Sequence, residues 1–217
     1  MTVHNPRARP ASYDKKVTLI LQGGGALGSY QAGVYEMLAE TDYLPDWVAG
    51  ISIGAINAAI IAGNAPENRV SQLRSFWEEV TAPTAWWPTG LIGPPAIWQK
   101  EASARSSLLF GQPGFFAPRA IQDWFSPEKP TSYYDTRALK DTLERLVDFD
   151  RINHARETRL SVGAVNVRTG RFAYFDSAEI AIRPEHVMAS GALPPGFPPV
   201  AIEGEHYWDG GLVSNTP

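Results

Sequence analysis

The first part of the chain alternates short apolar runs with stretches of helical periodicity. Strands are predicted over 16–22 and 44–49, and helices over 29–40, 55–62 and 70–81. In the first helix, Tyr30, Val34, Tyr35 and Leu38 share one face, which predicts packing through that face. Continuously apolar strands that alternate with helices are typical of a parallel sheet. The pattern therefore predicts a three-layer α/β fold with a mostly parallel central sheet and helices on both faces.

The second part continues with fewer helices. It predicts helices over 136–147 and 184–190, and strands over 158–166, 170–175 and 206–208. The strands over 158–166 and 170–175 are close enough to form a hairpin. A loop over 192–200, bounded by prolines, precedes the last strand. The chain ends six residues after Gly211, so we expect residues 16–217 to form a domain whose C-terminal part is missing.

Between the two parts, residues 82–130 differ from the rest of the chain in composition. They hold eight of the 18 prolines and four of the seven tryptophans. Proline at this density prevents long regular elements, so the segment is predicted to be an irregular insertion with one short helix near 118–125. Its aromatic side chains either form a small core of their own or make an apolar lid over a cleft, touching acyl chains or a lipid surface.

Composition and charge exclude several classes of protein. With 44% hydrophobic and 19% charged residues, the 217-residue chain is globular. A net charge of -4 argues against nucleic acid as a partner. The absence of cysteine excludes disulfides and thiolate chemistry and fits a reducing compartment. No apolar run reaches the length of a membrane span, and residues 1–15 are predicted to be a flexible leader. We expect a cytoplasmic protein that can bind peripherally at a membrane surface.

The candidate nucleophile is Ser52, at the junction of a strand and a helix. Gly50 and Gly54 flank it at two residues on either side, so the chain can bend sharply and leave space around the hydroxyl. The following helix offers free amide groups, including that of Ile53, and the positive end of its dipole to an oxyanion. The alternative interpretation is a serine that only caps the helix.

The candidate base is Asp209, which precedes Gly210 and Gly211. In an apolar cleft its pKa would rise, which makes the carboxylate a better proton acceptor for the Ser52 hydroxyl. The alternative is a simple turn. The four histidines are less suitable as the base. His4 lies in the leader, His154 in a polar connection and His186 at the start of a helix. His206 is predicted to lie on the strand face opposite Asp209.

A second glycine cluster, 23–28, ends the first strand. Its amide groups could form an anion-binding nest. Gly23, Gly25 and Gly28 also match the dinucleotide fingerprint, but that fingerprint needs an acidic residue at the carboxyl end of the second strand, whereas Asp46 opens that strand. The histidines are dispersed, so no metal site is predicted, and no cofactor is expected.

Taken together, these segments resemble the patatin-like phospholipase family of bacterial serine acyl hydrolases. The resemblance is carried by residues 22–28, 50–54 and 209–211, and by the proline-rich loop from Ala189 to Val200. It implies a Ser52–Asp209 dyad without histidine and an oxyanion hole from the first glycine block. The candidate donors are the amide groups of Gly23, Gly24, Gly25, Ala26 and Ile53. Leu27 stands where the family often has arginine or lysine, which bears on headgroup specificity.

The expected function is hydrolysis of ester bonds in lipids or related hydrophobic esters, as part of lipid metabolism or degradation. Two alternatives remain open at this point. The same acyl-enzyme could pass its acyl group to an alcohol or thiol, or the protein could be a catalytically silent module that only binds lipid. The oligomeric state is not predicted.

Overall fold

The computed structural model describes residues 13–82, 111–127, 129–155 and 157–217. The strands are β1 (Thr18–Leu21), β2 (Trp47–Ile51), β3 (Ala117–Pro118), β4 (Tyr134–Asp135), β5 (Arg159–Asn166), β6 (Phe172–Asp176), β7 (Val200–Ile202) and β8 (Glu205–Asp209). The α-helices are α1 (Gly28–Leu38), α2 (Ile53–Ala62), α3 (Pro66–Val80), α5 (Arg137–Leu146) and α6 (Pro184–Ser190). Short 3-10 turns are η1 (Gly25–Leu27), η2 (Ile121–Phe125) and η4 (Gly210–Leu212), and η3 (Arg151–Ala155) is a π-helical turn.

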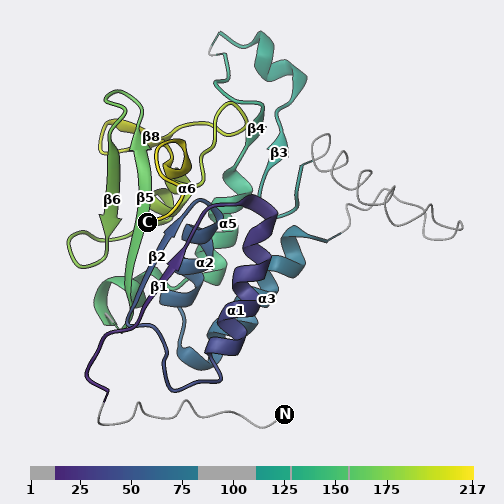
Figure 1. The fold of residues 1–217 in the computed structure, drawn as a ribbon. Coiled ribbons are helices and arrows are strands. Elements are labelled where there is room, and N and C mark those ends of the chain that lie inside the picture. Colours follow the sequence, from purple (N-terminus) through teal and green to yellow (C-terminus); the bar gives the residue numbers. More distant parts are fainter. Residues whose placement is uncertain (1–12, 83–110, 128, 156) are drawn as a thin grey trace, which may run out of the picture.

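The described residues form a six-stranded central sheet with the order β1-β2-β5-β8-β7, and β6 pairs with β5 (Figure 1). The pairs β1–β2 and β2–β5 are parallel, while β6 and β8 run antiparallel to β5 and β7 runs antiparallel to β8. Helices α2 and α6 contact the strands, and α1, α3 and α5 pack against those two helices. The predicted three-layer α/β fold, with a central sheet flanked by helices, is confirmed.

The core lies between the sheet and α2. Every residue of α2 is buried, which is expected of a helix that is apolar on all sides and packed within a protein. Ile56 and Ile60 of α2 and Phe76 of α3 are completely inaccessible to solvent. Each such side chain stabilises the fold by about 1.5–3 kcal/mol relative to an exposed one. The helix that follows Ser52 is therefore also at the buried centre of the domain.

The structure corrects the prediction for the first helix. Tyr35 and Leu38 face the core, but the side chain of Tyr30 is 77% exposed and that of Val34 is 43% exposed. Leu27, Tyr30, Val34 and Met37 form an outward apolar stripe, because positions three and four apart share a helix face. The pattern alone could not decide which of two adjoining apolar faces would be buried.

The strand β7 is a second difference. It begins at Val200, the last residue of the predicted proline-bound loop, in a stretch where no strand was predicted. It pairs with β8 across the two-residue turn Glu203–Gly204, in which both residues have positive φ. The short helix predicted within the insertion is present as η2. Most of the predicted leader (1–12) and of the insertion (83–110) lies outside the described residues.

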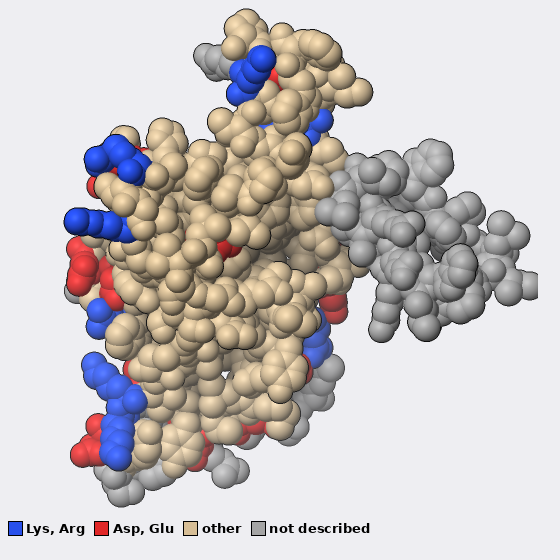
Figure 2. Space-filling model, turned by 45° about the horizontal axis from the view of Figure 1, so that its top comes forward, with Lys and Arg blue, Asp and Glu red and all other residues tan. Residues whose placement is uncertain are grey.

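The described part of the insertion includes β3, which pairs with β4 in a separate two-stranded sheet, and an arm with η2 that projects beyond this pair (Figure 1). At its base, Phe116 packs against Tyr134 and Phe197, with ring centroids 4.8 and 5.3 Å away. Further out, Ile121 and Phe125 of η2 are 78% and 85% exposed. In Figure 2 a broad face is formed almost entirely by uncharged residues, and charged side chains gather mainly along the margin on the β6 side.

Candidate active site

Ser52 occupies a sharp turn between β2 and α2. Its φ of 56° and ψ of -126° are unusual for a residue with a side chain, and the residue is partly exposed. The flanking glycines allow close backbone approach. A Cβ at Gly50 would lie 2.3 Å from the Gly54 carbonyl oxygen, and one at Gly54 would lie 2.2 Å from the Leu21 carbonyl oxygen. The turn therefore presents the hydroxyl at the carboxyl end of β2.

The register of β5 explains why Asp209 lies beside this turn. β6 pairs with one edge of β5, so β2 and β8 must share the other edge. β2 ends with Ile51 opposite Gly163, and β8, which runs the opposite way, ends with Asp209 opposite Ala164. Because Gly163 and Ala164 are consecutive, the two strands end against each other. The residue after Ile51 is thereby brought to the Asp209 side chain.

The Ser52 side chain lies beside the Asp209 carboxylate, and its hydrogen bonding acts on the pKa of that carboxyl group. Asp209 is 2% exposed, and its Oδ1 also accepts the Gly211 amide at 2.7 Å. Burial raises the pKa of Asp209, while the two hydrogen bonds act in the opposite direction, and the net shift is upward. The carboxylate is thus a stronger proton acceptor than one in water.

The first glycine block lies directly against Ser52. A Cβ at Gly23 would be 3.1 Å from the Ser52 Cβ. The structure corrects one predicted oxyanion donor, because the Gly23 amide donates to the Asn215 carbonyl oxygen at 3.0 Å. The Asn215 side chain in turn donates to the Gly23 carbonyl oxygen at 3.1 Å. Gly23 is therefore held by the C-terminal segment, and its N–H is not free for a ligand.

The other predicted donors remain available. In the part of the chain that the structure describes, no acceptor takes the N–H of Gly24, Gly25, Ala26 or Ile53. The first three belong to an exposed loop, and Ile53 begins α2, where the helix dipole favours negative charge. The Ser52 N–H is not available, because it donates to Ser190. These four amides could stabilise an oxyanion beside Ser52.

A buried polar network supports this loop from behind. Asn57 of α2 donates to the Gly28 carbonyl oxygen at 2.9 Å and to Gln31 at 3.0 Å, and Trp77 donates to Asn57 at 3.1 Å. A Cβ at Gly28 would lie 2.5 Å from Ile53 Cγ1, so only glycine lets α1 begin this close to α2. The start of α1 is therefore fixed relative to the Ser52 turn.

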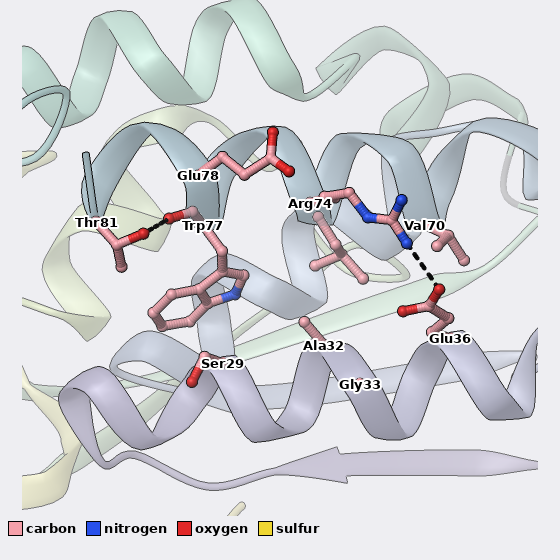
Figure 3. A pocket seen from close by; sticks show the side chains of 10 residues that line it. Ser29, Ala32, Gly33, Glu36, Val70, Arg74, Trp77, Glu78 and Thr81 are labelled. Atoms are coloured by element: carbon pink, nitrogen blue, oxygen red, sulfur yellow. Dashed lines mark hydrogen bonds and ion pairs between the residues drawn. The ribbon is translucent and has the colours of Figure 1, made fainter.

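A groove of about 340 Å³ lies between α1 and α3, away from Ser52 and Asp209 (Figure 3). Its lining includes Ser29, Gly33 and Trp77, and an ion pair of 2.8 Å between Arg74 and Glu36 spans it. The groove reaches the site only indirectly, through the hydrogen bond of Trp77 to Asn57.

None of the described histidines adjoins Ser52. His154 and His206 are exposed, while His186 is buried against Phe175, with 4.6 Å between the ring centroids. Burial lowers the pKa of His186 to about 4, and its Nδ1 accepts the Arg183 amide, so the ring is neutral at pH 7. Among the described residues, no group of three or more acidic, histidine or cysteine side chains could hold a metal ion.

The carboxylate required by the dinucleotide interpretation is not at the carboxyl end of β2. Asp46 precedes β2, at the opposite end of the strand from Ser52, where its carboxylate accepts the Val17 amide at 2.8 Å.

Sequence reasoning missed two residues that hold the site together, Ser190 and Asn215. Both act through contacts between segments far apart in the chain. The only signal available for Ser190 was its place in the proline-rich loop that carries part of the family resemblance. Nothing in the pattern singled out Asn215.

Comparison with known proteins agrees with the fold and the motifs. The family model described as Patatin-like phospholipase matches residues 19–217. A patatin-like phospholipase domain-containing protein of Chaetomium globosum is 32% identical over 111 residues, which cover 44% of this chain and 12% of that protein. A lysophospholipase of Aspergillus terreus is 34% identical over 87 residues, which cover 35% of this chain and 6% of that protein. The chain thus corresponds to a small part of these relatives.

Among solved structures, VipD from Legionella pneumophila aligns with 93% of this chain and 47% of its own, at 17% identity and a TM-score of 0.45. The family match covers nearly the whole described domain and includes the Ser52 turn, the glycine block and the Asp209 turn. The chain belongs to the patatin-like phospholipase family.

Proposed function

We propose that this protein is a serine acyl hydrolase that cleaves carboxylic esters of lipids. The single observation that carries the proposal is that the sheet register places Ser52 beside the buried Asp209 carboxylate, next to amide groups that have no acceptor among the described residues. A nucleophile, a base and oxyanion donors are the three parts that acyl transfer requires. Family membership supports lipid esters as the substrate class.

In the proposed reaction, Ser52 Oγ attacks the ester carbonyl carbon as its proton passes to Asp209. The amides of Gly24, Gly25, Ala26 and Ile53 stabilise the resulting oxyanion. When the tetrahedral intermediate collapses, the ester C–O bond breaks and Asp209 returns the proton to the leaving alcohol. Water then attacks the acyl-enzyme carbonyl carbon as Asp209 takes a proton from it. When this second intermediate collapses, the bond from Ser52 Oγ to the acyl carbon breaks, Asp209 returns the proton to Ser52 Oγ, and the carboxylic acid leaves.

The chain contains an internal comparison for this proposal. Ser161 Oγ lies 2.6 Å from Asp176 Oδ2, so it forms a second serine–aspartate pair. Ser161 lies within β5, whereas Ser52 precedes the first turn of a helix, and Ser161 is only 3% exposed. A fluorophosphonate probe should therefore label Ser52 and leave Ser161 unlabelled, as read by peptide mass spectrometry. A folded protein that takes no label at Ser52 would instead be a silent lipid-binding module.

The role of the glycine block over residues 23–28 can be tested with a matched pair of glycine substitutions, one in the block and one in α1. Gly25 has a φ of +56° but open space around a Cβ, whereas Gly33 lies in α1, also with open space. Gly25→Ala should strain the loop by about 1–2 kcal/mol and lower kcat for a short ester about tenfold or more, by displacing the amides. Gly33→Ala should leave kcat unchanged and stabilise the helix by up to about 1 kcal/mol. Equal kcat values for both variants and the wild type would argue against the loop's role.

We also propose that the arm meets the lipid surface. Ile121 and Phe125 are exposed at η2, and the broad face in Figure 2 carries few charges, so little desolvation opposes contact with lipid. In the part of the chain that the structure describes, no helix has the length and hydrophobicity of a membrane span. Contact through side chains of the arm would bring the protein to its substrate without such a helix.

The double variant Ile121→Ser and Phe125→Ser tests this contact. Each large apolar side chain that enters lipid contributes about 1.5–3 kcal/mol, so binding to phospholipid vesicles should fall at least tenfold in a co-sedimentation assay. Turnover of a water-soluble short-chain ester should not change. Tyr174→Ser, which removes a half-exposed aromatic ring from β6, is the control and should bind vesicles like the wild type. Unchanged vesicle binding by the double variant would reject the arm as the contact.

A further inference from the structure

Ser190, the last residue of α6, lies directly behind the Ser52 turn. The Ser52 amide donates to the Ser190 hydroxyl oxygen at 3.0 Å and to the Ser190 carbonyl oxygen at 3.1 Å. The Ser190 hydroxyl donates its own proton to the Gly163 carbonyl oxygen at 2.6 Å. Ser190 is completely inaccessible to solvent. One hydroxyl therefore joins the backbone of the proposed nucleophile to the central strand β5.

The same short segment also holds the proposed base. The Asp209 amide donates to the Ala192 carbonyl oxygen at 3.0 Å. Ser190 and Ala192 are two residues apart, so one segment of three residues contacts the backbone of both Ser52 and Asp209. Ser52 follows the end of β2 and Asp209 ends β8, and these two strands meet end to end on β5. The segment after α6 is a direct link between them.

The conformation of Ser52 makes this link important. A residue with a side chain at φ 56° is held in a strained conformation at a cost of order 1–3 kcal/mol, so surrounding contacts must maintain it. The Ser190 hydroxyl supplies one such contact. Because Ser190 takes the Ser52 amide, that amide is not a donor for an oxyanion, whereas the next amide, that of Ile53, has no acceptor among the described residues.

We propose that Ser190 is a positioning residue that sets the distance and angle between the Ser52 hydroxyl and the Asp209 carboxylate. The inference rests on the proposed function, since it concerns the same site. Ser190 does not touch the substrate. It acts by fixing the backbone of Ser52 to β5, while Ala192 fixes the backbone of Asp209 from the same segment.

Ser190→Ala removes the hydroxyl and keeps the carbonyl. Displacement of a reacting group by about 1 Å can cost about 100-fold in rate, so kcat for a short p-nitrophenyl ester should fall about 10- to 100-fold with KM nearly unchanged. The hydrogen bond from Ser52 lowers the pKa of Asp209, so weakening that bond should also shift the acidic midpoint of the pH–rate profile upward. A purely structural role would change neither quantity in the folded protein.

Ser177→Ala is the matched control. Ser177 is also a buried serine whose hydroxyl accepts an amide of β5, that of Leu160 at 2.9 Å, but it lies away from Ser52. This variant should lose stability without losing kcat. A Ser190→Ala enzyme with wild-type kcat and pH midpoint would overturn the inference.

Two further measurements keep the test decisive. Ser190→Cys keeps a similar volume with a weak donor and acceptor, so it should give an intermediate kcat; if Ser190→Ala does not fold, wild-type kcat in the cysteine variant overturns the inference. Wild-type protein that neither hydrolyses the ester nor reacts with a fluorophosphonate would contradict the proposed function itself, which is a different result from an active wild type with an unaffected Ser190→Ala variant.

Discussion

Ser52→Ala should abolish ester hydrolysis, with a fall in kcat of at least about 10⁴-fold, because removing the nucleophile of an acyl-transfer site leaves only binding and oxyanion stabilisation. The fold should survive. The Ser52 side chain contacts Asp209, whereas the turn is held through backbone contacts to Ser190, which alanine retains. The measurement is turnover of a p-nitrophenyl ester, with far-UV circular dichroism to verify folding.

Ser161→Ala is the control for this experiment. It removes a serine hydroxyl that donates to the Asp176 carboxylate, and it leaves the Trp47 indole N–H without its partner at 2.7 Å. We expect lower thermal stability but wild-type kcat in the folded fraction. Turnover that is equal in Ser52→Ala and the wild type would exclude Ser52 as the nucleophile.

Asp209→Asn should lower kcat by about 10³- to 10⁴-fold, because the amide cannot accept the Ser52 proton. Stability should be retained or increased. The raised pKa means that the folded state favours the neutral carboxyl, so the charged form costs stability at neutral pH. An asparagine before Gly210 can deamidate back to aspartate, so the mass of the variant must be checked after each assay.

Asp176→Asn should have the opposite effects on stability and on kcat. Burial is the largest influence on Asp176 and raises its pKa, but hydrogen bonds from Arg159, Ser161 and the Ala178 amide lower it overall. Its charge therefore contributes stability that is present above the ordinary aspartate pKa and lost as pH falls. Neutralising it should lower the melting temperature and leave kcat unchanged. Loss of kcat in Asp176→Asn but not in Asp209→Asn would reverse our assignment of the base.

The pH dependence follows from the same carboxylate. Asp209 must be deprotonated to act as a base, and its pKa is raised, so kcat/KM should fall on acidification with a midpoint above the ordinary aspartate value of 3.8. Asp209→Asn should remove this inflection from any residual activity. A wild-type profile without an acidic limb above that value would contradict the role of Asp209.

Local patterns predicted most of the elements because each depends on residues close in sequence. The strand before Ser52, the apolar run of α2 and the helix α6 follow from periodicity and from Gly and Pro positions. The motif residues Ser52 and Asp209 could be chosen for the same reason, since strand–turn–helix and strand–turn signals are local. Their proximity could not be derived from these signals and was an expectation from family resemblance.

The structure changed the predictions at residues whose surroundings depend on segments far away in the sequence. Gly23 looked like a free donor, but Asn215 lies 192 positions further along the chain and takes its amide. Tyr30 looked like a core residue, but α1 has two apolar faces, and packing on α2 and α3 selected the one with Tyr35. Both outcomes depend on which surfaces meet.

By itself, the sequence determined the order of strands and helices, the strained serine turn and the chemical types available for an acyl-transfer site. These follow from backbone preferences and side-chain periodicity, which act over a few residues. Tertiary structure alone decided that β2 and β8 end against each other on one edge of β5. It also decided that Ser190 and Ala192 accept the amides of Ser52 and Asp209, and that the Gly23 amide donates to Asn215. Such contacts depend on sheet register and on packing between segments that no local preference links.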